Sequence, residues 1–324
     1  GAIAEQRLHR SWIQPLYRLS YEDADELIEY APPQDDDLAE LHDLLGVRRR
    51  WRESQGALLM DQPEGRFRRC DEHAELEVVE PSASRLMVAE AMILANSTWG
   101  GWLAALGVPG IYRSQASMGP GVKVRMGTKP APHAGIGVKC YAWSTSPLRR
   151  YTDMVNQWQI IACAQHGATA ALAAPFKPKD AQMFAIISAF EAAYTAYNSY
   201  QSGMERFWTL QYLKQENITE VVASLVKEMG GGSWLVRADQ LPLMLSVMGA
   251  AGLARGDKVK VQLGSIDAMA LDVTGTVIEK ITSSDHNLET ASADESMEDL
   301  EEAATGPIAI AMNVNESPTE DPSA

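Results

Sequence analysis

Apolar positions recur at spacings of three and four in several stretches of the chain, which predicts helices. We expect them over residues 21–29, 38–55, 84–106 and 179–213. The longest stretch carries aromatic residues at helical spacing, typical of core positions: Phe184, Phe190, Tyr194, Tyr197, Phe207, Trp208 and Tyr212. Residues 114–133 are rich in Gly, Pro, Met and Lys, which predicts a flexible connection.

Alternating apolar and polar positions indicate strands, first over 57–60 and 74–79. From Ile218 onward the alternation returns with turn residues between the runs, and it is clearest over 258–279. Several short strands in a segment of this size predict a small closed barrel such as an OB-fold. Barrels of this kind often bind single-stranded nucleic acid, although many do not.

A further helix is predicted to begin at Ser146, whose hydroxyl could cap it, followed by Pro147 in the first turn. One face carries the apolar positions Leu148, Tyr151, Val155, Trp158 and Ala162, and the opposite face carries Arg149, Asp153 and Asn156. An arginine beside a helix start suits a phosphate, because the guanidinium and the dipole both favour an anion. The alternative is a core helix with a surface Arg149–Asp153 ion pair, worth about 0.3–0.5 kcal/mol.

Composition narrows the class of protein. The 324 residues suffice for a large domain and a smaller one, contain no apolar run of membrane-spanning length, and show no secretory signal. Three scattered cysteines are no disulfide framework, so we expect a reducing, cytoplasmic setting and no membrane partner. From Ile281 onward there are eleven acidic and no basic residues, so the preceding part carries only −4 of the net charge of −15. A local basic groove could therefore still bind nucleic acid. The arginine cluster at 48–52 is expected to be a solvated face.

The segment YAWSTSPLRRYTDMVNQ, Tyr141 to Gln157, closely resembles the signature of the ribonuclease II/R (RNB) exoribonucleases. Weaker likenesses extend over RLSYEDADEL (18–27), VAEAMILAN (88–96) and MERFWTLQYL (204–213). The resemblance implies an α+β RNB-type catalytic domain, partial, over 1–216. A small all-β OB-type RNA-binding barrel over 217–281 and a disordered acidic tail over 282–324 would follow it.

The resemblance also implies roles for individual residues. Arg149 would contact the scissile phosphate as the catalytic residue. If Arg149 does not have this role, the adjacent Arg150 would have it. Tyr21 would contact the ribose of the RNA end, where a 2′-hydroxyl contact selects RNA over DNA. Its alternative is a tyrosine packed under a helix.

Three further RNA-binding positions follow from the resemblance. Glu90 would lie near the ribose, although some relatives have two adjacent glutamates where this chain has Ala89 before Glu90. Met60 occupies a place where some relatives have a base-stacking phenylalanine, and stacking on methionine should be weaker. Glu205 would line the cavity, with Arg206 beside it.

Members of this family hydrolyse RNA with Mg²⁺ held by a cluster of aspartates that the sequence lacks. Asp35, Asp36 and Asp37 do not have its spacing, and after two prolines they are expected to form a solvated loop. The metal ligands are therefore expected upstream of Gly1, in a longer protein of which this chain is the C-terminal part. His133 is expected to be structural.

The resemblance implies a monomeric 3′-to-5′ exoribonuclease that hydrolyses single-stranded RNA to nucleoside 5′-monophosphates with Mg²⁺. By itself the chain is expected to be inactive, because a single arginine cannot replace the ions that activate the water. The alternative is a non-catalytic RNA-binding or scaffold protein derived from an RNB domain.

Overall fold

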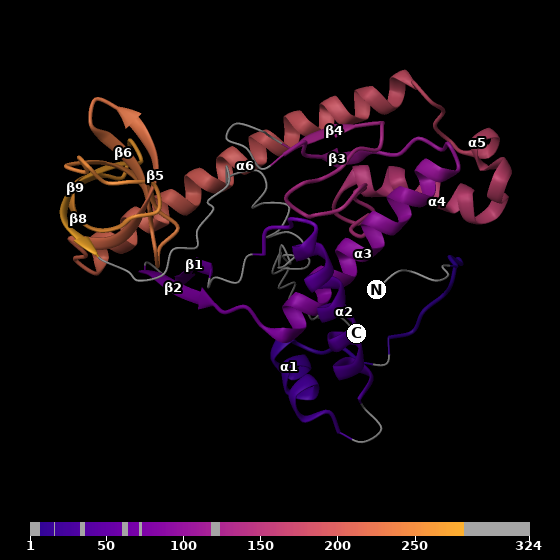
Figure 1. The fold of residues 1–324 in the computed structure, drawn as a ribbon, viewed down its shortest axis with the longest axis horizontal. Helices are drawn as coiled ribbons and strands as arrows, with labels where there is room; N and C mark the ends of the chain where they lie inside the picture. The colour runs from indigo at the N-terminus through magenta and orange to yellow at the C-terminus, as the bar shows by residue number, and fades with distance from the viewer. Residues whose placement is uncertain are drawn as a thin grey trace, which may run out of the picture.

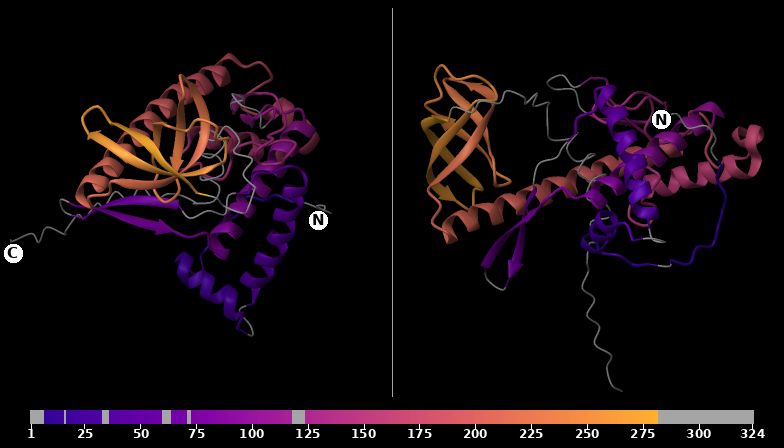
Figure 2. Two further views of the ribbon diagram at one scale, coloured as in Figure 1. Left: turned by 60° about the vertical axis from the view of Figure 1, so that its left-hand side comes forward. Right: turned by 60° about the horizontal axis from the view of Figure 1, so that its bottom comes forward.

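One long helix, α6 (Ala181–Gln215), connects a helix-rich region to a β-barrel (Figures 1 and 2). This arrangement confirms the predicted α+β class with a small barrel in the C-terminal part. No helix in the described part of the chain is long and apolar enough to cross a membrane. The acidic tail predicted over 282–324 lies outside the described residues. The structure is a computed structural model, which describes residues 7–15, 17–32, 36–59, 64–70, 73–117 and 124–281.

The first three helices, α1 (Tyr21–Tyr30), α2 (Asp37–Ser54) and α3 (Ala83–Ala105), confirm the helices predicted there to within a few residues. Ser20 begins α1 with a capping box, because its hydroxyl accepts from Asp23 N and its own N–H donates to the Asp23 carboxylate, both at 3.1 Å. The predicted ribose contact, Tyr21, is therefore the first residue of the helix, directly after its N-cap.

Strands β1 (Glu64–Cys70) and β2 (His73–Val79) form an antiparallel hairpin between α2 and α3. The strand predicted over 74–79 is confirmed. The strand predicted over 57–60 is wrong for residues 57–59, which have no regular structure, and residue 60 lies outside the described part. The single hydrogen bond from Leu58 N to Gly135 O ties this segment to a turn instead of a strand.

The segment predicted as a flexible connection, 114–133, contains β4 (Arg125–Gly127), which pairs with β3 (Tyr112–Ser114) at the start of the segment. Two polar residues in it are buried: Gln115 and His133 are 1% and 0% exposed. The Gln115 side chain accepts from Gly135 N at 2.9 Å, and His133 Nδ1 accepts from Ile136 N at 3.3 Å. The prediction is therefore wrong for these described residues, because buried side-chain hydrogen bonds replace the missing regular structure.

Helix α4 (Tyr151–His166) leads through a short 3₁₀ turn, η1 (Gly167–Thr169), and α5 (Ala170–Ala173) into α6. Asp180 begins α6, and its carboxylate accepts from Gln182 N at 2.8 Å. The helix predicted over 179–213 is confirmed, and it extends two residues further.

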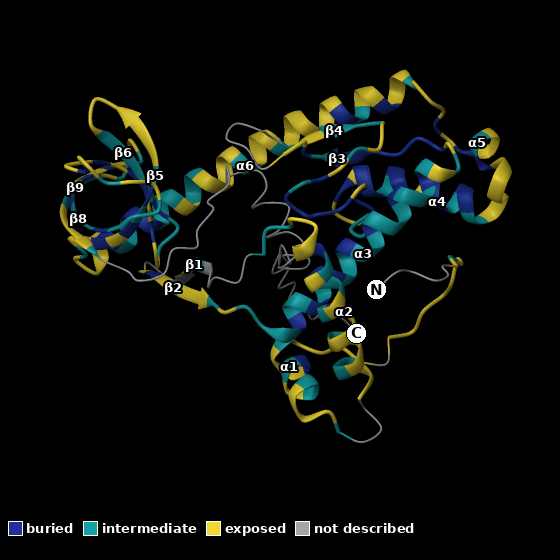
Figure 3. Cartoon of the chain, in the orientation of Figure 1, coloured by how far each residue is buried: buried dark blue, intermediate teal, exposed yellow. Residues whose placement is uncertain are grey.

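The aromatic residues of α6 are not all in the core, contrary to the prediction. Phe190 and Tyr194 pack on Trp143, with ring centroids 6.4 and 6.0 Å apart. Phe184 and Tyr197 are 47% and 51% exposed. The helix is longer than the body it covers, so much of its length faces solvent (Figure 3).

The five C-terminal strands form a closed barrel in the order β5-β6-β7-β9-β8, as expected for an OB-type barrel. β5 pairs antiparallel with β8 to close it, and β7 and β9 are parallel. At Gly275 a Cβ atom would lie 2.4 Å from Val261 Cγ1, so only glycine fits this crossing of strands. The strands are β5 (Glu220–Gly230), β6 (Ser233–Ala238), β7 (Met244–Met248), β8 (Lys258–Asp267) and β9 (Asp272–Ile281).

The end of α6 belongs to the barrel. Leu210 and Leu213 are buried in the barrel's hydrophobic core. Arg206 donates from Nε to Leu271 O and from Nη1 to Met244 O, both at 2.6 Å. One helix thus contributes to the core of the barrel at its C-terminal end and packs on Trp143 nearer its start.

Candidate functional site

The buried side of α4 combines polar and apolar residues, whereas the prediction placed Asp153 and Asn156 on the face opposite the apolar positions. Thr152, Asp153, Asn156 and Gln159 are each 0% exposed, whereas Leu148 in the preceding turn is 99% exposed. Of the predicted apolar face, Tyr151 and Trp158 are also exposed, while Val155 and Ala162 are buried. Buried polar groups require partners, and α4 finds them in the backbone of neighbouring segments.

Two side chains of α4 hold irregular backbone on both sides of the helix. Asn156 Nδ2 donates to Ile111 O at 2.9 Å and to Trp143 O at 2.7 Å, while Ile111 N donates to Asn156 Oδ1 at 2.7 Å. Gln159 Nε2 donates to Pro109 O and Phe176 O, at 2.8 and 3.0 Å. These bonds fix three separate segments against the helix, one upstream of it, one entering it and one after it.

The helix begins later than predicted. Residues 147–149 form a turn, Arg150 is the N-cap, and no side chain caps the helix, so the prediction that Ser146 caps it is wrong. Ser146 instead accepts at its carbonyl from Arg149 N (3.2 Å) and Arg150 N (3.0 Å). Its N–H donates to Asp153 Oδ1 at 2.9 Å. The turn is therefore closed by backbone bonds and anchored by a carboxylate of the helix that follows.

Arg150, not Arg149, pairs with Asp153. Its Nε and Nη2 donate to the two carboxylate oxygens, both at 2.9 Å, and its guanidinium carbon lies 3.9 Å from the centroid of a Trp143 ring. The expected Arg149–Asp153 surface pair is thus wrong, because the turn puts position 150 over the indole and one helical turn from the carboxylate. Arg113 also lies over Trp143, at 4.0 Å.

Arg149 lies in the turn and is exposed. Its neighbour is buried and bonded on two sides, so only the first of the two adjacent arginines faces outward. A guanidinium on a fixed backbone can present two parallel donors to a phosphate. The role of Arg149 in binding the scissile phosphate stays a prediction. Arg150 is 5% exposed and bonded to Asp153, an arrangement that supports the turn.

Helix α3 supports the same segment from the other side. Asn96 Oδ1 accepts from Ser144 N at 2.9 Å, and its Nδ2 donates to Tyr141 Oη and Thr145 Oγ1, both at 3.3 Å. Asn96 is 0% exposed. It is the last residue of the VAEAMILAN segment (88–96), in which the family resemblance implies a role only for Glu90. Its contribution is to position residues 141–145.

Glu90 is buried and engaged. Arg52 Nε donates to Glu90 Oε2 at 2.9 Å, and Arg52 Nη2 donates to Glu90 Oε1. A third donor, Arg52 Nη1, reaches Ile136 O at 2.6 Å. The expectation of a solvated arginine face is therefore wrong for Arg52, which is 2% exposed. The carboxylate of Glu90 thus forms an ion pair that joins α3 to α2. Its contact with the ribose stays a prediction.

Tyr21 is partly exposed at the start of α1, next to the start of α3. Ser84 Oγ donates to Tyr21 O at 3.1 Å, and the guanidinium carbon of Arg85 lies 4.2 Å from its ring centroid. Asp25 of the same helix accepts from Ser84 N at 2.7 Å. The backbone of Tyr21 is thus fixed against α3, and its ribose contact stays a prediction.

The remaining predicted positions lie apart. Glu205 is an exposed residue of α6 whose carbonyl accepts from Thr209 Oγ1 at 2.8 Å, far along the helix from Trp143. Arg206 binds barrel backbone and does not line a cavity with it. Met60 lies outside the described residues. Arg113, at Trp143, was missed, since a lone arginine in a strand carries no signal.

Burial determines the state of two thiols. It raises the pKa of both Cys140 and Cys163 to about 11 from the ordinary 9.0, so both are neutral thiols at physiological pH. Neither is therefore an activated nucleophile. Over the described ranges, no group of three or more His, Cys, Asp or Glu side chains could hold a metal ion.

The comparisons with known proteins point to one family. An RNB domain model matches residues 1–122 and 122–166. An uncharacterized ribonuclease of Synechocystis, sll1290, is 28% identical over 295 residues, which are 82% of this chain and 43% of the relative. The chloroplastic/mitochondrial ribonuclease II of Arabidopsis thaliana is 26% identical over 81% of this chain and 36% of the relative. The chain thus spans less than half the length of these relatives.

A solved structure supports the fold. RNase R of Mycoplasma genitalium, in complex with ribose-methylated single-stranded RNA, superposes with a TM-score of 0.61 at 13% identity. The match covers 79% of this chain and 53% of that protein. Together with the family model, it places the signature turn and α4 in a known fold: this chain belongs to the RNB domain family, whose relatives here are exoribonucleases of the ribonuclease II/R type.

Proposed function

We propose that this chain is the RNA-handling part of a 3′-to-5′ exoribonuclease that shortens single-stranded RNA to nucleoside 5′-monophosphates, with Arg149 on the scissile phosphate. The observation that carries the proposal is the match of the RNB domain model to residues 122–166, which contain the signature with Arg149, whereas Arg150 is fixed on Asp153 and Trp143. A family signature otherwise rich in buried hydrogen bonds has one exposed cation at its turn.

The guanidinium of Arg149 suits the hydrolysis of a phosphodiester bond. A phosphate in the transition state gains negative charge, and an arginine held in place beforehand stabilises it without reorganising. The turn gives Arg149 a fixed backbone position, because hydrogen bonds to Ser146 O and Asp153 hold the backbone of the turn. Arg149 would therefore position the phosphate and hold charge. Tyr21, fixed at Ser84, would contact the ribose.

Relatives and fold support RNA as the substrate class. The matched RNase R structure contains single-stranded RNA. The five-stranded barrel belongs to an architecture that often binds single strands, with aromatic and basic side chains along the path. Another matched structure of the same RNase R contains double-stranded RNA, so the relatives support RNA as the substrate class, and the barrel architecture is what favours a single strand.

Magnesium is the metal that the family implies, and the described residues do not fit it. Mg²⁺ in nucleases takes carboxylate oxygens and waters in a near-octahedral set. The described ranges contain no cluster of three or more candidate ligands, and Glu90 is already bonded to Arg52. We therefore assign no step of the reaction to a metal held by these residues.

The test uses the natural protein that contains this sequence, at the length at which it is made, with RNA labelled at its 3′ or 5′ end. Digestion from the 3′ end releases labelled mononucleotide at once from the 3′-labelled strand, and only gradual shortening appears with the 5′ label. The opposite order of products, or internal cuts, would contradict the proposed direction.

A second candidate is an RNA-binding protein that does not cut. The pairing of Glu90 with Arg52 favours it, because a carboxylate predicted near the ribose is used to join two helices. Tight binding of the same labelled RNA with no mononucleotide release, in the presence of added Mg²⁺, would establish this second function. DNA of the same sequence serves as the control for selectivity in both cases.

A further inference from the structure

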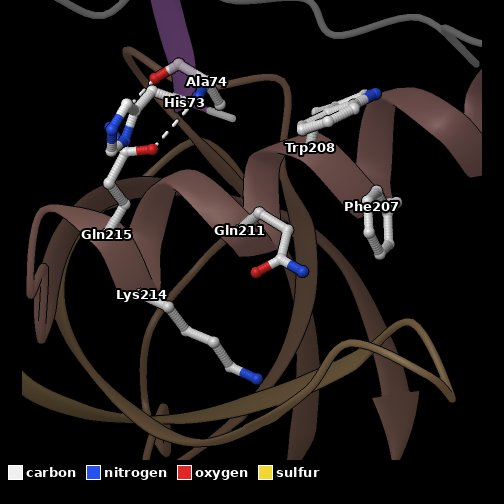
Figure 4. Close-up of a pocket in the computed structure, with 7 residues that line it drawn as sticks. All are labelled: His73, Ala74, Phe207, Trp208, Gln211, Lys214 and Gln215. Carbon is white, nitrogen blue, oxygen red and sulfur yellow. Dashed lines mark hydrogen bonds between the residues drawn. The ribbon is translucent and has the colours of Figure 1, made fainter. Parts of the chain in front are cut away.

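A pocket lies at the other end of α6, between its last turns and the β1–β2 hairpin, away from the signature turn (Figure 4). Its volume is about 540 Å³. Besides Ala74, the side chains around it are Phe207, Trp208, Gln211, Lys214 and Gln215 of α6 and His73 of β2. The pocket shares no residue with the site around Arg149.

Helical spacing explains why these residues gather. Positions 207 and 208 precede 211 by four and three residues, and 214 and 215 follow it by three and four. Side chains at such separations lie on one face of a helix, above one another. Figure 4 shows Trp208 and Phe207 at one level of this face and Gln211 and Lys214 at the following levels.

The hairpin wall is held in register with the helix. Ala74 N donates to Gln215 Oε1 at 3.0 Å, and Gln215 Nε2 donates to Ala74 O at 3.1 Å. Phe67 of β1 packs on Tyr212 with a centroid distance of 5.4 Å. The amide and ring contacts thus fix the strand edge that carries His73, so the pocket has two walls that do not depend on a ligand.

The exposed groups match those that single-stranded nucleic acid requires. Phe207 packs edge-on against Trp208, at 5.3 Å and 79°, which steadies an indole that is still partly exposed. Next to it stand the amide of Gln211 and the exposed ammonium of Lys214. An aromatic face accepts any base, an amide bonds to a base edge, and an ammonium suits a phosphate.

We propose that this pocket is a second RNA site, which stacks one base of a single strand on Trp208 and holds an adjacent phosphate with Lys214. Resting on the proposed function, it adds a contact outside the catalytic region. Backbone hydrogen bonds from Ala270 and Met269 lower the pKa of Asp267 in the barrel, and the charge of Lys214 adds to this lowering, so an acidic group shares the electrostatic surroundings of the ammonium.

The two sites are separated along the helix. Tyr194 touches Trp143, beside Arg150, and Trp208 follows fourteen residues later. At 1.5 Å per residue this corresponds to about 21 Å along the helix axis. A strand occupying both sites must therefore be several nucleotides long, whereas a dinucleotide is too short to reach from one to the other.

The test is binding of a fluorescent oligouridylate of about twenty nucleotides, longer than the single-strand footprint of one OB-type barrel. Trp208→Ala should weaken binding by about tenfold, and Trp208→Phe should retain most of the affinity, because any aromatic face can stack. Lys214→Gln should reduce the slope of log affinity against log salt by about 0.7, the value for one phosphate contact on a single strand. Trp12→Ala removes a fully exposed tryptophan elsewhere and is the matched control.

A second measurement keeps the test independent of folding of the variants. The wild-type chain is crosslinked to a 4-thiouridine oligonucleotide, and the adduct should map to residues 204–215. If the wild-type chain binds RNA while Trp208→Ala binds like Trp12→Ala and no adduct maps there, the pocket is not an RNA site and the proposed function stands. If the wild-type chain binds no single-stranded RNA, both proposals fail.

Discussion

Arg150 and Asp153 form a two-point ion pair that is closed to solvent, with side chains 5% and 0% exposed and both nitrogen–oxygen distances 2.9 Å. The same carboxylate accepts from Ser146 N. One buried aspartate therefore fixes the guanidinium, the turn and the first turn of α4. Arg149, which precedes Arg150 in the chain, therefore lies on the exposed side of a turn whose backbone is held in place.

Asp153→Ala should strongly destabilise the protein. It removes four hydrogen bonds and leaves the Arg150 guanidinium buried without its counter-charge. Breaking a buried pair from one side costs about 3–5 kcal/mol, so the free energy of unfolding in urea should fall by that amount. Asp43→Ala, at an exposed carboxylate that pairs with His42, should change it by less than about 0.5 kcal/mol. A loss at position 153 as small as the control would mean that the pair does not support the fold.

Arg149→Ala should separate stability from turnover. The side chain is exposed, so the unfolding free energy should change by less than about 0.5 kcal/mol. If the guanidinium holds charge in the transition state, kcat for RNA hydrolysis by the natural protein should fall by about 100-fold or more, with a smaller change in RNA affinity. Arg149→Lys keeps the charge but not the fork, and should recover only part of the rate. Equal losses in affinity and in kcat would place Arg149 in ground-state binding.

Periodicity predicted the helices and the barrel because their apolar faces repeat at the periods of those structures. It failed at α4, where Asn156 and Gln159 are buried by backbone groups of segments without regular structure. A side-chain pattern reports nothing of such partners, which are distant in sequence. From sequence alone, the buried amide side chains of such a helix are therefore assigned to its exposed face.

The candidate site shows a second limit. The family resemblance located the two adjacent arginines but could not tell which turns inward; Trp143 and Asp153 decide this through stacking and pairing. Likewise, no pattern near Glu90 in the sequence predicts its ion pair with Arg52, which lies 38 positions earlier. Contacts across such separations depend on how helices pack, and the pattern along one helix does not encode them.

The Arg52–Glu90 pair should behave as one unit in a double-mutant cycle. Arg52→Ala and Glu90→Ala each leave a buried charge, so each should lower the unfolding free energy by about 3–5 kcal/mol. The double variant removes both charges and should lose less than the sum, with a coupling of about 0.5–3 kcal/mol. Glu53→Ala, one residue along α2 and exposed, serves as the control. Additive losses would show that the two side chains do not stabilise one another.

The raised pKa values of Cys140 and Cys163 predict how stability changes at alkaline pH. Burial raises the pKa of Cys140 and Cys163 to about 11, whereas in the unfolded chain each ionises near its ordinary value of 9.0. Between pH 9 and 11 the unfolded state therefore binds fewer protons than the native state, and the free energy of unfolding should fall as the pH rises. Below pH 9 both states hold the neutral thiol, so these groups should contribute no slope. Urea unfolding from pH 8 to pH 11 measures this, and Cys140→Ala/Cys163→Ala should show a shallower decline over the upper part of that range. An unchanged slope in the double variant would assign the alkaline loss to other groups.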